Sequence, residues 1–281
     1  MKEFITSDLH LHPGDRSADA VRSLAAYVTA VGRPQDVLII GGDHAGDDDG
    51  IRECLTLFAG FRGRRLAISG NHDVWVPSSG RDSWQRYLDL RSLYRGLGFS
   101  PLEDRPVAVG DTAYIGLMGW YDYSFHDPRL GHPAEAYVGK TDPGTGRPVW
   151  ADSVFVRWNF SDDEMTRFQA RRLERHLVLT DGARRRLVVM HHVPTRRLLF
   201  RPRCFVPRKW RVANTFLGSD VFAEIIGSRT AIPTAVVCGH IHTGKRVAVG
   251  GVDYTSIGSS RYGRELLIRH GDRTERKIFR A

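Results

Sequence analysis

Cysteine is scarce in this sequence of 281 residues, whose three cysteines, Cys54, Cys204 and Cys238, lie far apart. Because they form neither a closely spaced pair nor an even set, we expect neither a disulfide framework nor a cysteine zinc cluster. Cys238 follows two valines of an apolar run, so we expect it to be buried as a small apolar side chain. This use of cysteine favours a reducing compartment.

Long apolar runs are missing too. No stretch approaches the ~18 apolar residues that span a bilayer, and the opening residues MKEFITSDLHLHPGD lack the basic start and apolar core of a secretion signal. The composition, 41% hydrophobic and 26% charged, is typical of a soluble globular protein. We therefore expect a cytoplasmic protein with no membrane partner, and its oligomeric state stays open.

Acidic residues are absent between Gly182 and Ser219, although the whole chain is only moderately basic, with 41 Lys and Arg against 32 Asp and Glu. The positive charges of this basic segment are Arg184, Arg185, Arg186, Arg196, Arg197, Arg201, Arg203, Arg208, Lys209 and Arg211. The segment is expected either to attract a polyanion such as a nucleic acid or to form an ordinary solvated face.

Short β-rich runs alternate with helical patterns, which predicts an α/β fold. We expect strands at residues 3–7, 36–40, 65–69, 107–109, 113–118, 187–190, 234–238, 246–249, 252–257, 265–269 and 276–279. Helices are expected at residues 19–31, at 51–61 after an acidic cap at 47–49, and after Ser161, which forms a capping box with Glu164. Gly110-Asp111 and Gly250-Gly251 predict hairpin turns.

The alternation fails between residues 120 and 160, where prolines and glycines interrupt it and aromatic residues are dense. We interpret this region as an ordered insertion within one domain that spans residues 1–281, because no linker or change in composition divides the chain. Most of its aromatic side chains are expected to pack in a small core. Residues 121–125 follow a strand directly and are the part expected to face a site.

Five short clusters contain nearly all of the residues suited to bind metal ions, and each directly follows an expected strand. They are Asp8-Leu9-His10, Gly42-Asp43-His44, Gly70-Asn71-His72-Asp73, His191-His192-Val193-Pro194 and Gly239-His240-Ile241-His242. Because ligands bind at the carboxyl ends of strands in an open α/β sheet, we expect the clusters to converge. Imidazole and carboxylate groups without thiolate indicate divalent metals, and a mixed set of this kind indicates two ions. Any one cluster alone is equally well explained as a turn or a helix cap.

Taken in this order, the clusters resemble the calcineurin-like metallophosphoesterase superfamily over residues 8–242. The resemblance implies a two-sheet β-sandwich flanked by helices, a four-layer αββα fold, with a dinuclear metal centre at the top of the sandwich. It also implies the ligands: Asp8, His10 and His242 for the first ion, Asp43 as the bridge, and Asn71, His191 and His240 for the second. Manganese is the expected metal, with iron, zinc, nickel or magnesium as alternatives.

The sequence departs from the family pattern after Asp43, where GDxxD or GDxxN is usual and Gly46 stands at the last position here. We expect this departure to change local hydrogen bonds and to leave the metal centre intact. In the fourth cluster the spacing to Pro194 favours His191 as the ligand, with His192 as the alternative. His44 has no support from a motif and is assigned a loop role.

His72 is the residue that most favours catalysis. It resembles the family's histidine that contacts the phosphate and protonates the leaving oxygen, a task suited to imidazole near neutral pH. Asp73 is expected to orient it. We therefore expect a metallophosphoesterase, a hydrolase that cleaves a P–O bond of a phosphodiester or nucleotide by attack of a hydroxide held at the dinuclear centre. The alternatives are a phosphomonoesterase or protein phosphatase, and a non-catalytic scaffold that keeps the fold.

Overall fold

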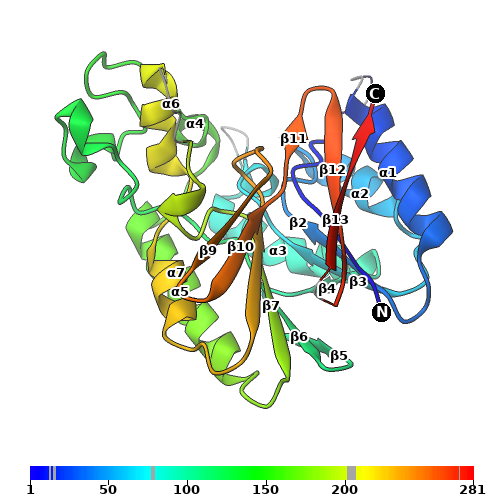
Figure 1. Ribbon diagram of the computed structural model, residues 1–281. Helices are drawn as coiled ribbons and strands as arrows, with labels where there is room; N and C mark the ends of the chain where they lie inside the picture. Colours follow the sequence, from blue (N-terminus) through cyan, green and yellow to red (C-terminus); the bar gives the residue numbers. More distant parts are fainter. Residues whose placement is uncertain (13, 15–16, 77–79, 201–206, 272) are drawn as a thin grey trace.

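The computed structural model describes residues 1–12, 14, 17–76, 80–200, 207–271 and 273–281. Two β-sheets pack face to face, and helices cover the outer face of each sheet (Figure 1). This arrangement confirms the predicted four-layer αββα fold. The expectations for Cys204, Arg201 and Arg203 lie outside the described residues.

The first sheet is built around parallel strands from the N-terminal part of the chain. Its strands lie in the order β11 (Ser259–Ser260), β12 (Gly263–His270), β1 (Glu3–Thr6), β2 (Val37–Gly41), β3 (Arg64–Ile68) and β4 (Ser100–Pro101), and β13 (Arg273–Arg280) pairs with β12. The strands from β1 to β4 are parallel, while β12 is antiparallel to β1. Helices α1 (Ser17–Val31), α2 (Asp48–Thr56) and α3 (Ser83–Gly96) pack on its outer face.

The second sheet has the order β5 (Val107–Val109), β6 (Thr112–Leu117), β7 (Arg185–Met190), β8 (Thr234–Cys238), β10 (Val252–Ser256) and β9 (Lys245–Val249). Strands β6, β7, β8 and β10 are parallel to one another. Helices α5 (Asp162–Val178) and α7 (Val221–Gly227) cover its outer face. The two predicted hairpins are confirmed, because β5 pairs with β6 and β9 pairs with β10, both antiparallel.

The central strands are buried on both faces, and alternate residues serve the two sides. In β2, Val37 and Ile39 pack between the sheets, whereas Leu38 and Ile40 pack among the residues under the helices. A strand buried on both faces needs a continuous apolar run, which explains the sequence VLIIG. Burial contributes roughly 1.5–3 kcal/mol for each such side chain, so the sandwich holds the ends of its strands in a fixed register.

The insertion between β6 and α5 is ordered by short helical turns and by its aromatic side chains. It contains η2 (Pro128–Leu130), η3 (Ala134–Tyr137) and α4 (Asp152–Phe155). Trp120, Tyr121, Tyr123 and Tyr137 are almost completely buried in the core under the first set of helices. The rings therefore pack in a core as expected, but this core is continuous with the one under α1, α2 and α3 and is not a small separate one. Residues between β7 and α7 form η4 (Arg196–Leu198), α6 (Arg208–Ala213) and η5 (Asn214–Phe216), and η1 (His72–Val74) follows β3.

The helix caps agree with the sequence analysis, but one long helix was missed. Asp47 caps α2 by accepting a hydrogen bond from the backbone N–H of Gly50, and α5 begins with the predicted capping box. Helix α3 was not predicted, because its buried face includes Arg86, an ion-pair partner of Asp48 that interrupts the apolar period.

Across the described parts of the chain, no helix is both long and apolar enough to span a bilayer.

Candidate metal centre

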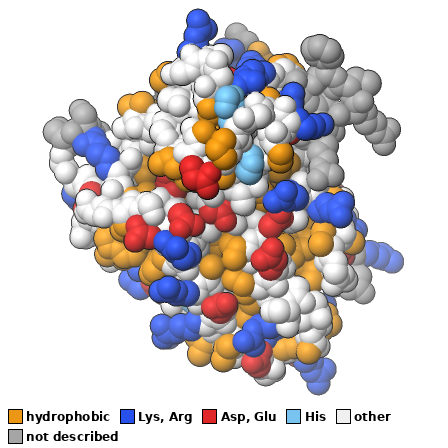
Figure 2. Space-filling view, turned by 90° about the vertical axis from the view of Figure 1, so that its left-hand side faces the viewer, with side chains coloured by type: hydrophobic (Ala, Val, Ile, Leu, Met, Phe, Trp, Pro, Cys, Tyr) orange, Lys and Arg blue, Asp and Glu red, His pale blue; other side chains and the backbone are white. Residues whose placement is uncertain are grey.

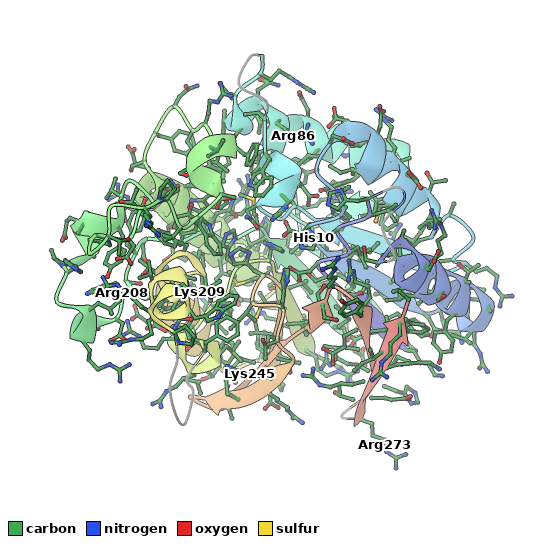
Figure 3. The ribbon with its side chains drawn as sticks, turned by 90° about the horizontal axis from the view of Figure 1, so that it is seen from above. His10, Arg86, Arg208, Lys209, Lys245 and Arg273 are labelled. Carbon is green, nitrogen blue, oxygen red and sulfur yellow. The ribbon has the colours of Figure 1, made fainter. Side chains whose placement is uncertain are left out.

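The five clusters meet at one end of the sandwich, beyond the carboxyl ends of β1, β2, β3, β7 and β8. Viewed from this end, His10 lies near the middle of the molecule (Figure 3). Two groups of side chains there have ligand atoms within 4.8 Å of one another: Asp8, His10, Asp43 and His242 form the first, and Asp43, His191 and His240 form the second. The predicted convergence is confirmed, and Asp43 belongs to both groups.

The carboxylate of Asp43 lies between the two groups. Its Oδ2 is 3.5 Å from Nε2 of His10, and its Oδ1 is 3.3 Å from Nε2 of His191. Burial alone would raise the pKa of this carboxyl, but His191, His72 and His10 lower the pKa well below its usual range. Oδ2 is buried and has no hydrogen-bond partner among the described residues. A buried, ionised oxygen without a donor suits a carboxylate that bridges two cations.

The first group presents three further ligand atoms. Nε2 of His242 lies 3.1 Å from Oδ1 of Asp8 and 3.3 Å from Nε2 of His10. Burial alone would raise the pKa of Asp8, yet His242 lowers this pKa to about 2. Burial lowers the pKa of His10 to about 4. At neutral pH this group therefore includes an anionic carboxylate and a neutral imidazole, the forms that bind metals.

In the second group, the ring of His191 is held by a hydrogen bond of Nδ1, the nitrogen that does not face Asp43. Nδ1 donates to the carbonyl oxygen of Gly41 at 3.0 Å, which leaves Nε2 facing Oδ1 of Asn71 at 3.1 Å. His192 points elsewhere, because its Nδ1 donates to the carbonyl oxygen of Met118. The structure therefore brings His191, and not His192, against Asp43. The ring of His192 instead packs against the ring of His240, with centroids 4.3 Å apart.

The backbone is strained at most of the predicted ligands. Seven non-glycine residues have a positive φ among those described, and five of them are Asp8, His10, Asp43, His240 and His242, with φ between 41° and 66°. Each such conformation costs on the order of 1–3 kcal/mol, and strain of this kind concentrates at functional sites. Backbone geometry thus indicates five of the seven predicted ligands by a route independent of the motifs, and Asn71 and His191 are not among them.

Two motif glycines are required by close approach. A Cβ on Gly70 would lie 2.2 Å from Oδ1 of Asp43, and one on Gly239 would lie 2.5 Å from Oδ2 of Asp8. Any larger residue at either position would displace a carboxylate of the centre. This explains why glycine precedes the ligands in both clusters.

His72 lies at the edge of the centre and is oriented by an aromatic ring. Its Nε2 is 3.9 Å from Oδ2 of Asp43, and its side chain is 28% exposed. The imidazole stacks on Trp75, with ring centroids 3.6 Å apart and planes inclined by 26°, and Trp75 stacks in turn on Phe155. His72 is therefore placed where a group bound to the centre would contact it.

The expectation that Asp73 orients His72 is wrong. The Asp73 carboxylate is fully buried and accepts hydrogen bonds from the backbone N–H groups of Asp43, His44 and Gly70, and from Nδ1 of His44 at 2.9 Å. It therefore joins the loops that follow β2 and β3. His44, assigned to a loop by default, is a fully buried member of this junction.

The sequence analysis missed Asp152, a fully buried residue of the insertion. Its Oδ1 accepts hydrogen bonds from Nδ2 of Asn71 at 3.0 Å and from Nε1 of Trp75 at 2.7 Å. Its Oδ2 accepts from the hydroxyl of Tyr121 at 3.1 Å and from Nε1 of Trp150 at 2.9 Å. Asp152 thus fixes the amide of Asn71 with its oxygen toward His191, and it fixes the ring on which His72 stacks.

A cavity of about 590 Å³ opens beside the centre. Asp43, Asn71, His72, His240 and His242 line it on the side of the centre, and the remainder is lined by aromatic and aliphatic side chains together with Asp152 and Thr243. The insertion contributes residues 149–152 to this cavity, so the expectation that residues 121–125 face the site is wrong. A second cavity of about 580 Å³ lies at the opposite ends of the strands, away from the clusters.

The four-layer sandwich and the two His/Asp groups that share Asp43 define an α/β protein with a candidate dinuclear metal centre. The sequence model of the calcineurin-like phosphoesterase family matches residues 1–244, and the chain belongs to this family. No curated protein sequence matches the chain.

Solved structures share the fold. Phosphopantetheinyl hydrolase from Mycobacterium tuberculosis is 21% identical, with a TM-score of 0.69, and the match covers 92% of this chain and 90% of that one. GAP50, the anchor in the inner membrane complex of Plasmodium, is 9% identical, with a TM-score of 0.51 and coverage of 99% and 84%. At these identities the likeness supports the fold alone.

Proposed function

We propose that this protein is a metal-dependent hydrolase that cleaves phosphodiesters. The observation that carries the proposal is the position of Asp43, a buried and ionised carboxylate whose two oxygens face different groups of ligand atoms. Imidazole, carboxylate and amide donors without thiolate suit manganese, with iron, zinc, nickel or magnesium as alternatives.

The residues divide into two ligand sets around Asp43. Asp8, His10 and His242 would hold one ion, and Asn71, His191 and His240 would hold the other. Two bound ions would supply an activated water and positive charge for the oxygens of the phosphoryl group.

We assign His72 the role of donating a proton to the leaving oxygen. A general acid must lie within hydrogen-bond reach of the atom that it protonates. His72 lines the cavity and lies next to Asp43, and its stacking on Trp75 restricts the ring. Its presence favours an enzyme over the alternative of a non-catalytic scaffold.

The composition of the cavity favours a diester over a monoester. Among the described residues that line it there is no lysine or arginine. A phosphomonoester carries about one more negative charge than a diester near neutral pH, and Lys or Arg groups are the usual partners of such charge. The single charge of a diester needs only the two cations of the centre.

Ion pairs that arginines of the basic segment form with acidic residues outside it favour a small diester over a nucleic acid. Arg208 pairs with Asp142 at 2.7 Å, Arg211 pairs with Asp127 at 2.8 Å, and Arg196 pairs with Asp220. Basic and acidic side chains are interspersed over the face shown in Figure 2. Charges that are already paired attract a polyanion weakly.

The test is a comparison of substrates with protein reconstituted with each candidate metal. We expect a larger kcat/KM for bis-p-nitrophenyl phosphate than for p-nitrophenyl phosphate, and slow cleavage of DNA and RNA. A preference for the monoester would favour a phosphomonoesterase. Metal binding without hydrolysis of any ester would favour the scaffold.

A further inference from the structure

Four aromatic rings, together with aliphatic side chains, form the walls of the cavity beside the metal centre. Trp75 and Trp150 line it together with Phe200 and Trp210, and the latter two rings pack with centroids 5.4 Å apart. The rings come from the residue that follows η1, from the insertion and from the segment around α6, which are far apart in the sequence. In Figure 3, the labelled residues Arg208 and Lys209 show where α6 lies relative to His10.

Two of these rings are fixed in place by one carboxylate. The Nε1–H groups of Trp75 and Trp150 both donate to Asp152, at 2.7 and 2.9 Å. Trp150 also stacks on Phe216, with centroids 5.5 Å apart and planes inclined by 20°. Because both indole N–H groups are already bonded, these tryptophans offer the cavity apolar ring carbons in a rigid arrangement, which lowers the entropic cost of binding a ligand.

Away from the centre, few of the described side chains that line the cavity could pair with a charged ligand group. Among the described lining residues, the only ionisable side chain outside the histidines and Asp43 is that of Asp152. Each oxygen of that carboxylate already accepts two hydrogen bonds. A ligand charge placed among the rings would therefore lose its hydration without gaining a partner.

We propose that this cavity binds an uncharged apolar group, with the size of one or two fused rings, carried by the phosphate ester. The proposal rests on the proposed function and narrows its substrate class to small diesters of an apolar alcohol. The cavity volume of about 590 Å³ lies within the range of about 300–1,000 Å³ that is common for small-molecule sites.

The expected gain in binding affinity can be calculated from the apolar area that a ring would bury. A naphthyl group in place of a methyl group adds on the order of 100 Å² of buried apolar surface, and at about 25 cal/mol per Å² this corresponds to a gain in affinity of up to about 70-fold. A single phenyl ring should give an intermediate gain.

The experiment measures binding, so that it does not depend on turnover. Methyl esters of methyl-, phenyl- and 2-naphthylphosphonic acid carry one negative charge, as a phosphodiester does, and their affinities for the manganese-loaded protein are measured by calorimetry. We expect the affinity to rise in that order. A 4-sulfophenyl analogue should bind no better than the methyl compound, because its ring carries a charge into the apolar walls.

Two variants locate the effect. Trp210 is 46% exposed, so Trp210→Ala should leave the protein folded while it reduces the preference for naphthyl over methyl by about 5-fold or more. Tyr262→Ala is the matched control, because Tyr262 is 60% exposed and lies outside the cavity. It should keep the full preference.

Equal affinities across the series, absence of binding by every compound, or an unchanged preference in Trp210→Ala would overturn the proposal. If the rise in affinity is seen and no diester is hydrolysed, the cavity assignment stands and the proposed function fails. If diesters are hydrolysed without any preference for apolar groups, the function stands and the cavity assignment fails.

Discussion

Replacement of Asp152 by leucine tests whether the insertion organises the metal centre. Asp152 accepts four hydrogen bonds, from Asn71, Trp75, Tyr121 and Trp150. The leucine side chain is similar in size and has no acceptor, so all four donors lose their partner. Two of them, on Asn71 and Tyr121, belong to residues that are almost completely buried.

The substitution is expected to lower both the stability of the protein and its affinity for metal. A buried donor without a partner costs roughly 1–3 kcal/mol, so the two buried donors of Asn71 and Tyr121 should together lower the free energy of unfolding of the metal-free protein by about 2–6 kcal/mol. Asn71 also loses the contact that directs its oxygen toward His191. Loss of such an orienting contact typically weakens metal binding by about 10–100-fold.

Chemical denaturation of the metal-free protein measures the loss of stability, and calorimetric titration with manganese measures the loss of metal affinity. Asp162→Leu is a matched control, because Asp162 accepts from Nε1 of Trp120, the hydroxyl of Tyr123 and Nζ of Lys140 in the same insertion. It should lose comparable stability and keep its metal affinity. Unchanged metal binding in Asp152→Leu, or equal weakening in both variants, would refute the positioning role.

The remaining predictions concern the histidines. His72→Ala should keep both ions and lose about 10²–10⁴-fold in rate on esters with poor leaving groups but much less on nitrophenyl esters; equal losses measured on both would indicate a role other than proton donation. His191→Ala should abolish binding of one ion in a metal titration, whereas His192→Ala should retain two; the reverse result would exchange their roles. Burial alone would lower the pKa of His191, but Asp43 raises this pKa to about 9. A raised pKa stabilises the fold fully below pH 6.5 and progressively less toward pH 9. The denaturation midpoint of the metal-free protein should therefore fall across that range, and His191→Gln should flatten the decline; an equally steep decline in the variant would contradict this.

The convergence of the five clusters was predictable because each ligand directly follows a strand. The apolar runs of β1, β2, β3, β7 and β8 mark those strands locally, and parallel pairing carries their carboxyl ends to one edge. The positions of the ligands thus depend on short-range signals and on one topological rule.

The parts that were missed depend on contacts between distant residues. Asp152 lies 81 positions from Asn71 and belongs to no recognisable motif. One signal was present, namely an aspartate close to Trp150 and Phe155 in a region dense in aromatic residues, since buried indole and phenol groups need acceptors. The role of Asp73 was mispredicted because adjacency to His72 says nothing about side-chain direction, and the carboxylate bonds to the loop after β2 instead.

The most direct test of the dinuclear centre is the metal content of the wild-type protein and of Asp43→Ala, measured by elemental analysis after reconstitution with manganese and removal of free metal. Asp49→Ala, which changes an exposed acidic residue of α2, serves as the control. Two ions per chain are expected in the wild type and in the control, and fewer in Asp43→Ala, because both ions lose a ligand and the charge that screens their repulsion. Two tightly bound ions in Asp43→Ala, or a single ion in the wild type, would contradict the assignment of Asp43 as the bridge.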